Sequence, residues 1–196
     1  FLKTNFIQML SLAVQQLRLD FAGKKKPTLI ILGFFYHFLT LDKAERFKNV
    51  ELSTIDTGLL MAGVLAAMSY FDAPNPTEKK IRQLADKLYR RVDWDWAMNN
   101  NPHMSMGWHP ETGFIKSEWK GYNEAMVLLV MAMGSPTHPI PANSWEKWCE
   151  TYQWDTFEGY DYVNFEPLFG HQYSHIFIDF KGIVIDSNFS ILLCSR

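Results

Sequence analysis

The 196-residue sequence has few cysteines, little net charge and no long hydrophobic run. Its two cysteines, Cys149 and Cys194, give neither a disulfide framework nor metal-site spacing. No metal and no other cofactor is expected. The formal net charge of −2 offers no broad basic surface, which argues against nucleic acid as a partner. The apolar run from Leu29 to Leu39 is shorter than the roughly 20 residues of a membrane-spanning helix, so we expect it in the protein core.

Motifs for phosphoryl and acyl transfer are also missing. The sequence contains no Gly-rich phosphate loop, no nucleophile elbow and no Cys–His pair in a recognisable context. His171 and His175 are four residues apart, but Gln172 stands where a metalloprotease motif requires Glu, so hydrogen-bonded histidines are the preferred interpretation. The start of the sequence lacks the pattern of a secretion signal, and none is expected in this chain.

Helical patterns dominate the sequence. Residues 5–21 place apolar side chains at the three–four spacing of one helical face. Residues 53–71 begin with Ser53 and Asp56, three apart as in a capping box, and residues 75–91 begin with Asn, Pro and an acid in the first turn. Further helices are predicted after Glu124, from Ser144 and from Pro167 to about residue 180.

Residues 93–120 follow neither period and are dense in Asn, Gly, Pro and Trp. They predict a long ordered loop or a short hairpin, and long loops inside compact domains are usually functional. Roughly six helices with little strand predict an all-α fold in a single domain over residues 1–196, with inner and outer helical layers.

Two acids next to aromatic loops are candidates for catalysis. Glycosidic cleavage requires one carboxylic acid to protonate the leaving oxygen and a second carboxylate across the bond. Glu124 opens an apolar helix directly after a Gly-Tyr-Asn loop, where partial desolvation would favour the protonated form that a general acid needs. Glu124 and Asp56 also occupy first-turn positions, where an acid commonly serves only the helix dipole or a capping box, and the local sequence alone favours that structural role.

Several sequence blocks carry a more specific signal. They are GFFYHFL at 33–39, ELSTIDTGLLMAG at 51–63, LYRRVDWDWAM at 88–98, GYNEAM at 121–126, GSPTHPIP at 134–141, TYQW at 151–154 and PLFGHQYSHIFIDFKG at 167–182. In order and spacing, these blocks resemble the glycoamylase-like family of bacterial carbohydrate enzymes, which includes β-1,2-glucanases and the central domain of cyclic β-1,2-glucan synthases. The resemblance covers residues 33–182, and the sequence departs from the family at both ends.

The resemblance implies an (α/α)6 toroid with glucan in its central cleft, of which this sequence would form about half. It implies that Glu124 of GYNEAM protonates the glycosidic oxygen and that Asp56 of STIDT is a second carboxylate of the cleft. The residues expected to hold sugar rings are Trp108, Trp119, Tyr122, His138 and His171. A half-toroid would leave apolar flanks open, which predicts a homo-oligomer.

Three functions stay open at this level. The resemblance favours a hydrolase or transglycosylase of β-linked glucan, with β-1,2-glucan preferred and a periplasmic or secreted address. The first alternative is a non-catalytic glucan-binding or assembly fragment of such an enzyme. The second is a glucoamylase-type hydrolase of α-glucan.

Overall fold

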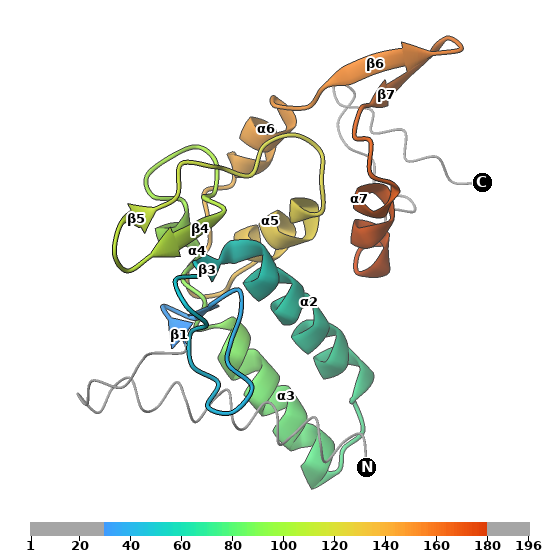
Figure 1. The fold of residues 1–196 in the computed structure, drawn as a ribbon. Coiled ribbons are helices and arrows are strands. Elements are labelled where there is room, and N and C mark those ends of the chain that lie inside the picture. The colour runs from blue at the N-terminus through green and yellow to red at the C-terminus, as the bar shows by residue number, and fades with distance from the viewer. Residues whose placement is uncertain (1–29, 180–196) are drawn as a thin grey trace.

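The structure, a computed structural model, describes residues 30–179 (Figure 1). Within this range the chain forms six α-helices, which are α2 (Thr54–Tyr70), α3 (Pro76–Tyr89), α4 (Trp94–Ala97), α5 (Ala125–Met133), α6 (Ser144–Cys149) and α7 (Leu168–Tyr173). A short 3-10 helix, η2 (Ser174–Ile176), follows α7. The helix predicted at residues 5–21 lies outside the described residues. None of the described helices combines the length and apolar character needed to cross a bilayer.

The prediction of an all-α fold, about half of an (α/α)6 toroid, is wrong, because three small antiparallel sheets accompany the helices. Their strands are β1 (Ile30–Ile31) with β2 (Phe34–Phe35), β3 (Leu52–Ser53) with β4 (Gly107–His109) and β5 (Gly113–Phe114), and β6 (Trp154–Phe157) with β7 (Tyr160–Val163). Strands of two to four residues are too short for the period-two alternation that marks a strand in sequence. The segment predicted as a loop or hairpin contains α4 and the β4–β5 hairpin.

The predicted starts of α2 and α3 are confirmed, and side-chain caps explain both. The Ser53 hydroxyl accepts a hydrogen bond from the backbone N–H of Asp56 at 3.2 Å. Asn75 accepts one from the backbone N–H of Glu78 at 2.9 Å, and Pro76 occupies the first helical position. These bonds satisfy N–H groups that a helix leaves without partners in its first turn.

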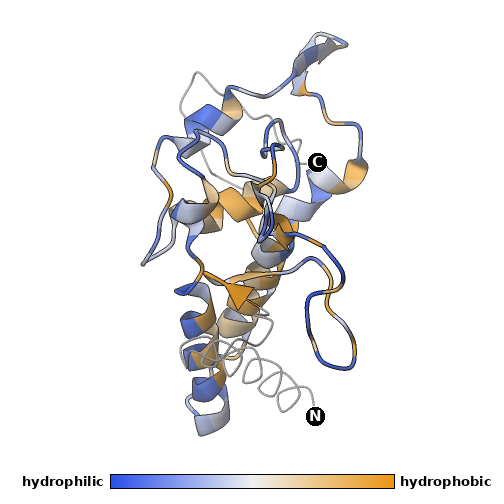
Figure 2. Cartoon of the chain, turned by 60° about the vertical axis from the view of Figure 1, so that its left-hand side comes forward, coloured by the Kyte–Doolittle hydropathy of each residue, from blue (hydrophilic) through white to orange (hydrophobic). Residues whose placement is uncertain are grey.

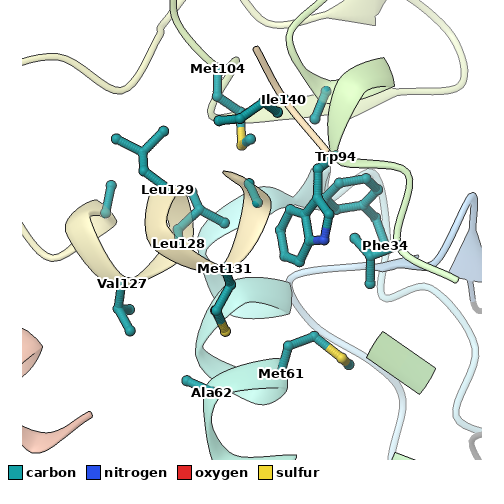
Figure 3. Packing of buried hydrophobic residues seen from close by; sticks show 14 of the residues in the cluster. Phe34, Met61, Ala62, Trp94, Met104, Val127, Leu128, Leu129, Met131 and Ile140 are labelled. Atoms are coloured by element: carbon teal, nitrogen blue, oxygen red, sulfur yellow. The ribbon is translucent and has the colours of Figure 1, made fainter. Parts of the chain in front are cut away.

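The core lies where α2 packs against α3 and against α5, and α5 is buried over almost its whole length. Figure 2 shows the hydrophobic residues concentrated on the central helices and the hydrophilic ones on the outlying helix faces and loops. Met131 of α5 points towards Met61 and Ala62 of α2 in Figure 3. A Cβ at Gly58 would lie only 2.7 Å from Leu128 Cδ1, so glycine lets α2 and α5 approach closely.

A buried hydrogen bond joins the segment before α5 to the start of α2. The indole N–H of Trp119 donates to Thr54 Oγ1 at 2.9 Å, and that hydroxyl donates in turn to the Ser105 carbonyl at 2.9 Å. Trp119 is only 9% exposed. The tryptophan therefore fixes the chain that leads to Glu124 against the first residue of the helix that carries Asp56.

We expect Trp119→Phe to lower the free energy of unfolding by about 1–3 kcal/mol, because it removes the donor to a buried hydroxyl. Urea denaturation followed by circular dichroism measures the change. Trp145→Phe is the matched control, since that partly buried tryptophan lacks a hydrogen bond from its indole to any described residue. A loss for Trp119→Phe no larger than that of the control would contradict the assignment.

Candidate functional site

Asp56 lies in the first turn of α2 with its two carboxylate oxygens in different surroundings. Oδ2 is enclosed by protein and has no hydrogen-bond partner among residues 30–179. The side chain as a whole is nevertheless 42% exposed. The carboxylate therefore turns one oxygen inwards and leaves the rest of the group open to water or a ligand.

His37 faces the inward oxygen of Asp56. Its Nε2 lies 3.6 Å from Asp56 Oδ2, and its Nδ1 lies 2.7 Å from Glu51 Oε1. The ring stacks on Phe38, with 4.2 Å between centroids. The backbone N–H of His37 donates to the Glu51 carbonyl at 3.0 Å, so the main chains of the two residues are also joined. Glu51, His37 and Asp56 thus lie side by side, and a side-chain hydrogen bond joins only the first two.

The groups around Glu51 favour its ionised form. Partial burial acts to raise the pKa of Glu51, but hydrogen bonds from its own backbone and from His37 outweigh it, and the pKa lies below its usual value. The nearby Arg46 side chain forms a two-pronged ion pair with Glu111, at 2.5 and 3.0 Å, and donates to the Val50 carbonyl at 2.7 Å. Arg46 thereby holds the loop before Glu51 against the β4–β5 turn.

Glu124 stands at the N-terminus of α5 without capping it. Its carboxylate makes no capping hydrogen bond, and the side chain is partly buried. The preceding Asn123 performs this task, because its Oδ1 accepts from the backbone N–H of Ala125 at 2.9 Å. The amide of Asn123 also donates to the Lys120 carbonyl at 3.0 Å. The structural role that local sequence favours for Glu124 is therefore filled by its neighbour.

Asp56 and Glu124 lie on two helices in direct contact. Gly58, two residues beyond Asp56, packs against Leu128, four residues beyond Glu124. Each carboxylate is therefore within about one helical turn of the α2–α5 contact. In the part of the chain that the structure describes, neither a hydrogen bond nor an ion pair joins the two side chains.

Of the predicted sugar-binding residues, the structure brings Tyr122 and His171 together. Their rings stack with 5.0 Å between centroids, and Tyr152 meets Tyr122 edge-on at 5.7 Å. His171 Nε2–H donates to the Phe165 carbonyl at 2.7 Å, which fixes the ring. Burial raises the pKa of Tyr122, whose hydroxyl finds no hydrogen-bond partner among the described residues.

The other three predicted sugar-binding residues are dispersed. Trp119, in the segment before α5, is buried against the first residue of α2. Trp108 is partly buried in β4, with its ring edge-on to Trp96 at 5.7 Å. His138 is exposed in the loop after α5, where its backbone N–H donates to Ser135 Oγ at 3.2 Å. Sugar binding by all five residues stays a prediction.

Sequence reasoning missed His37 and Glu51 as functional residues, although both lie in blocks that carry the family resemblance. The signal that could have found them is that each block contains one such polar residue, His37 or Glu51, close to a short apolar stretch that forms β2 or β3. Tyr36 forms a bridge with Leu52, and this pairing sets His37 opposite Glu51.

Comparison with known proteins supports one family. The family model named Glycoamylase, whose description is putative glucoamylase, matches residues 116–194. An exo β-1,2-glucooligosaccharide sophorohydrolase (non-reducing end) of Parabacteroides distasonis is 29% identical over 156 residues, which are 70% of this chain and 22% of that protein.

Solved structures give the same picture. A putative glucoamylase from Bacteroides caccae is 28% identical with a TM-score of 0.62, over 74% of this chain and 39% of that one. An endo-β-1,2-glucanase from Chitinophaga pinensis, in complex with sophorotriose and glucose, is 24% identical with a TM-score of 0.67, over 74% and 39%. The chain therefore spans less than half the length of these relatives. The family model, the sequence relative and the shared fold together show that the chain is similar to members of the glycoamylase-like family.

Proposed function

We propose that this chain carries catalytic groups of a glycoside hydrolase that acts on β-1,2-glucan, with Glu124 as the general acid and Asp56 as the second carboxylate. The observation that carries the proposal is the state of Glu124. Its carboxyl group stands at a helix start that Asn123 already caps, so it is available for chemistry. The names of the relatives support β-1,2-glucan as the substrate class.

The chemistry follows from two carboxyl groups on opposite sides of a glycosidic bond. Protonated Glu124 gives its proton to the bridging oxygen while the bond from that oxygen to C1 breaks, and the leaving sugar departs as an alcohol. Positive charge that develops at C1 is stabilised by the carboxylate of Asp56. A water molecule adds to C1 and gives up a proton to a carboxylate, so one water is consumed for each bond broken.

The aromatic groups are proposed to position the glucan. Flat ring faces pack against the C–H faces of sugar rings, and the imidazoles of His138 and His171 add hydrogen bonds. His171 uses Nε2 to bind the Phe165 carbonyl, which leaves Nδ1 as an acceptor for a sugar hydroxyl. The partly buried Trp108 and the stacked pair of Tyr122 and His171 supply the ring faces.

We expect the chain to release products from β-1,2-gluco-oligosaccharides and none from soluble starch. Incubation with a panel of β-1,2-, β-1,3- and β-1,4-linked glucans and starch, with chromatographic analysis of the products, measures this. Cleavage of starch alone would select the α-glucan alternative.

A non-catalytic role is the second candidate, because the chain covers only 22% of the sophorohydrolase and 39% of the endo-glucanase. Calorimetric binding of a β-1,2-gluco-oligosaccharide without any cleavage would select this role over hydrolysis. Self-association of the chain stays a prediction, which light scattering would test.

A further inference from the structure

His37 lies between two carboxylates, and each ring nitrogen faces one of them. Nδ1 is 2.7 Å from Glu51 Oε1, and Nε2 is 3.6 Å from Asp56 Oδ2. The first distance is that of a strong, charge-assisted hydrogen bond. The second is slightly longer than a hydrogen bond. The ring is therefore anchored at Glu51 and directed at Asp56.

The positions of the protons follow from this geometry. An ionised carboxylate can only accept hydrogen bonds, so the nitrogen that faces Glu51 carries a proton. Hydrogen bonds from His37 and from the Glu51 backbone keep Glu51 ionised, and the charges of His37 and His109 act in the same direction. With Nδ1 protonated, a neutral His37 ring directs a lone pair from Nε2 at Asp56.

In this arrangement the inward oxygen of Asp56, Oδ2, lacks a hydrogen-bond donor among the described residues. Oδ2 is enclosed and has no hydrogen-bond partner in the described range of the chain, which is costly for a carboxylate oxygen. Two lone pairs that face each other repel. A proton held between Nε2 and Oδ2 removes the repulsion and gives the enclosed oxygen its donor.

We propose that His37 is a positioning residue for Asp56. Anchored by Glu51, His37 shares a proton with Oδ2 and so keeps Oδ1 turned outwards, towards the substrate and water. The inference rests on the proposed function, because it assigns the work of His37 to the second carboxylate of that reaction. The role of His37 is indirect, since the ring acts through Asp56.

The surroundings of the ring support a fixed orientation. The ring stacks on Phe38, and this contact restricts its rotation. The charged and titratable groups around it are Glu51 and Asp56, which face it directly, and Arg46 and His109, which interact with Glu51. Arg46 is itself paired with Glu111.

Nitrogen NMR of the whole chain with ¹⁵N-labelled histidine tests the anchoring. We expect the neutral ring of His37 to carry its proton on Nδ1 and to leave Nε2 unprotonated. His37→Gln identifies the signals by their disappearance. In Glu51→Gln, whose amide can donate to Nδ1, we expect the proton to move to Nε2. A wild-type neutral ring protonated at Nε2 would overturn the proposal.

Two variants of His37 distinguish a role in positioning Asp56 from a role in stabilising the fold. The Gln amide can occupy the place of Nε2 and donate to Asp56, whereas the Asn amide occupies the place of Nδ1 and reaches only Glu51. We expect His37→Asn to lower kcat on β-1,2-gluco-oligosaccharides on the order of 10- to 100-fold, with KM little changed, as for small misplacements of catalytic groups. His37→Gln should recover most of this loss.

Equal losses in the two variants, or a loss confined to KM, would contradict the proposal. Thermal unfolding of both variants checks that the fold is retained. The two proposals fail in different ways. A wild-type chain that cleaves no glucan removes the proposed function, whereas an Nε2-protonated ring in an active wild-type chain removes only the role of His37.

Discussion

Glu124→Gln is expected to slow the cleavage of β-1,2-gluco-oligosaccharides by about 10²- to 10⁴-fold, the range that a positioned general acid contributes. Glutamine keeps the size and polarity of the side chain but cannot give up a proton. Because Asn123 caps α5, the substitution should leave the unfolding midpoint close to that of the wild type. Product chromatography and thermal circular dichroism measure the two effects.

A change of leaving group makes this test specific for acid catalysis. An aryl glucoside whose phenol is already acidic needs little protonation as it departs, so Glu124→Gln should slow its hydrolysis far less than that of a gluco-oligosaccharide. Equal losses on the two substrates would show that Glu124 binds or supports the substrate without acting as the acid. Glu146→Gln is the control, because Glu146 is an exposed acid in the first turn of α6.

Gly33→Ala is expected to cause the largest loss of stability, about 2–5 kcal/mol. Gly33 has φ +88°, a conformation that side chains with a Cβ rarely adopt. An added Cβ would also lie 2.5 Å from the Arg91 carbonyl oxygen and 2.6 Å from Val92 Cα, which are backbone atoms that cannot rotate away. The estimate combines a conformational cost of about 1–2 kcal/mol with an overpacking cost of about 1–3 kcal/mol.

Gly63→Ala is the matched control for this substitution. Gly63 lies inside α2, is exposed, and would place a new Cβ in open space. Alanine should therefore stabilise the protein by about 0.5–1 kcal/mol, since it favours the helix over the unfolded chain. Urea unfolding of both variants gives the comparison, and a neutral Gly33→Ala would show that the β1–β2 turn does not pack against Arg91 and Val92 as described.

The helices were predictable from sequence where the determinants are local. Ser53 and Asn75 cap helices whose first residues follow them directly, so the signal lies within a few positions. The strands were not predictable in this way. β3 pairs Leu52 with Trp108, and this pairing depends on tertiary contacts that no short window of sequence contains. The all-α prediction failed for that reason.

The residues of the candidate site also differ in whether local sequence or tertiary contacts reveal them. Asp56 and Glu124 could be named as candidates because they are first-turn acids near aromatic loops, but only the family resemblance favoured a catalytic role over a structural one. The contact of His37 with Glu51 could not be predicted, because it results from the bridge between Tyr36 and Leu52. Tyr122 and His171 were each named from the family resemblance, but only the fold shows that their rings stack.

The cap supplied by Asn123 has a consequence for the design of variants. Folding and chemistry are assigned to neighbouring positions, so the identity of residue 124 can be exchanged without undoing the first turn of α5. Position 123 lacks this freedom, because both ends of its amide are committed to the backbone. Engineering of new acid–base chemistry in this scaffold should therefore vary residue 124 and keep the asparagine before it.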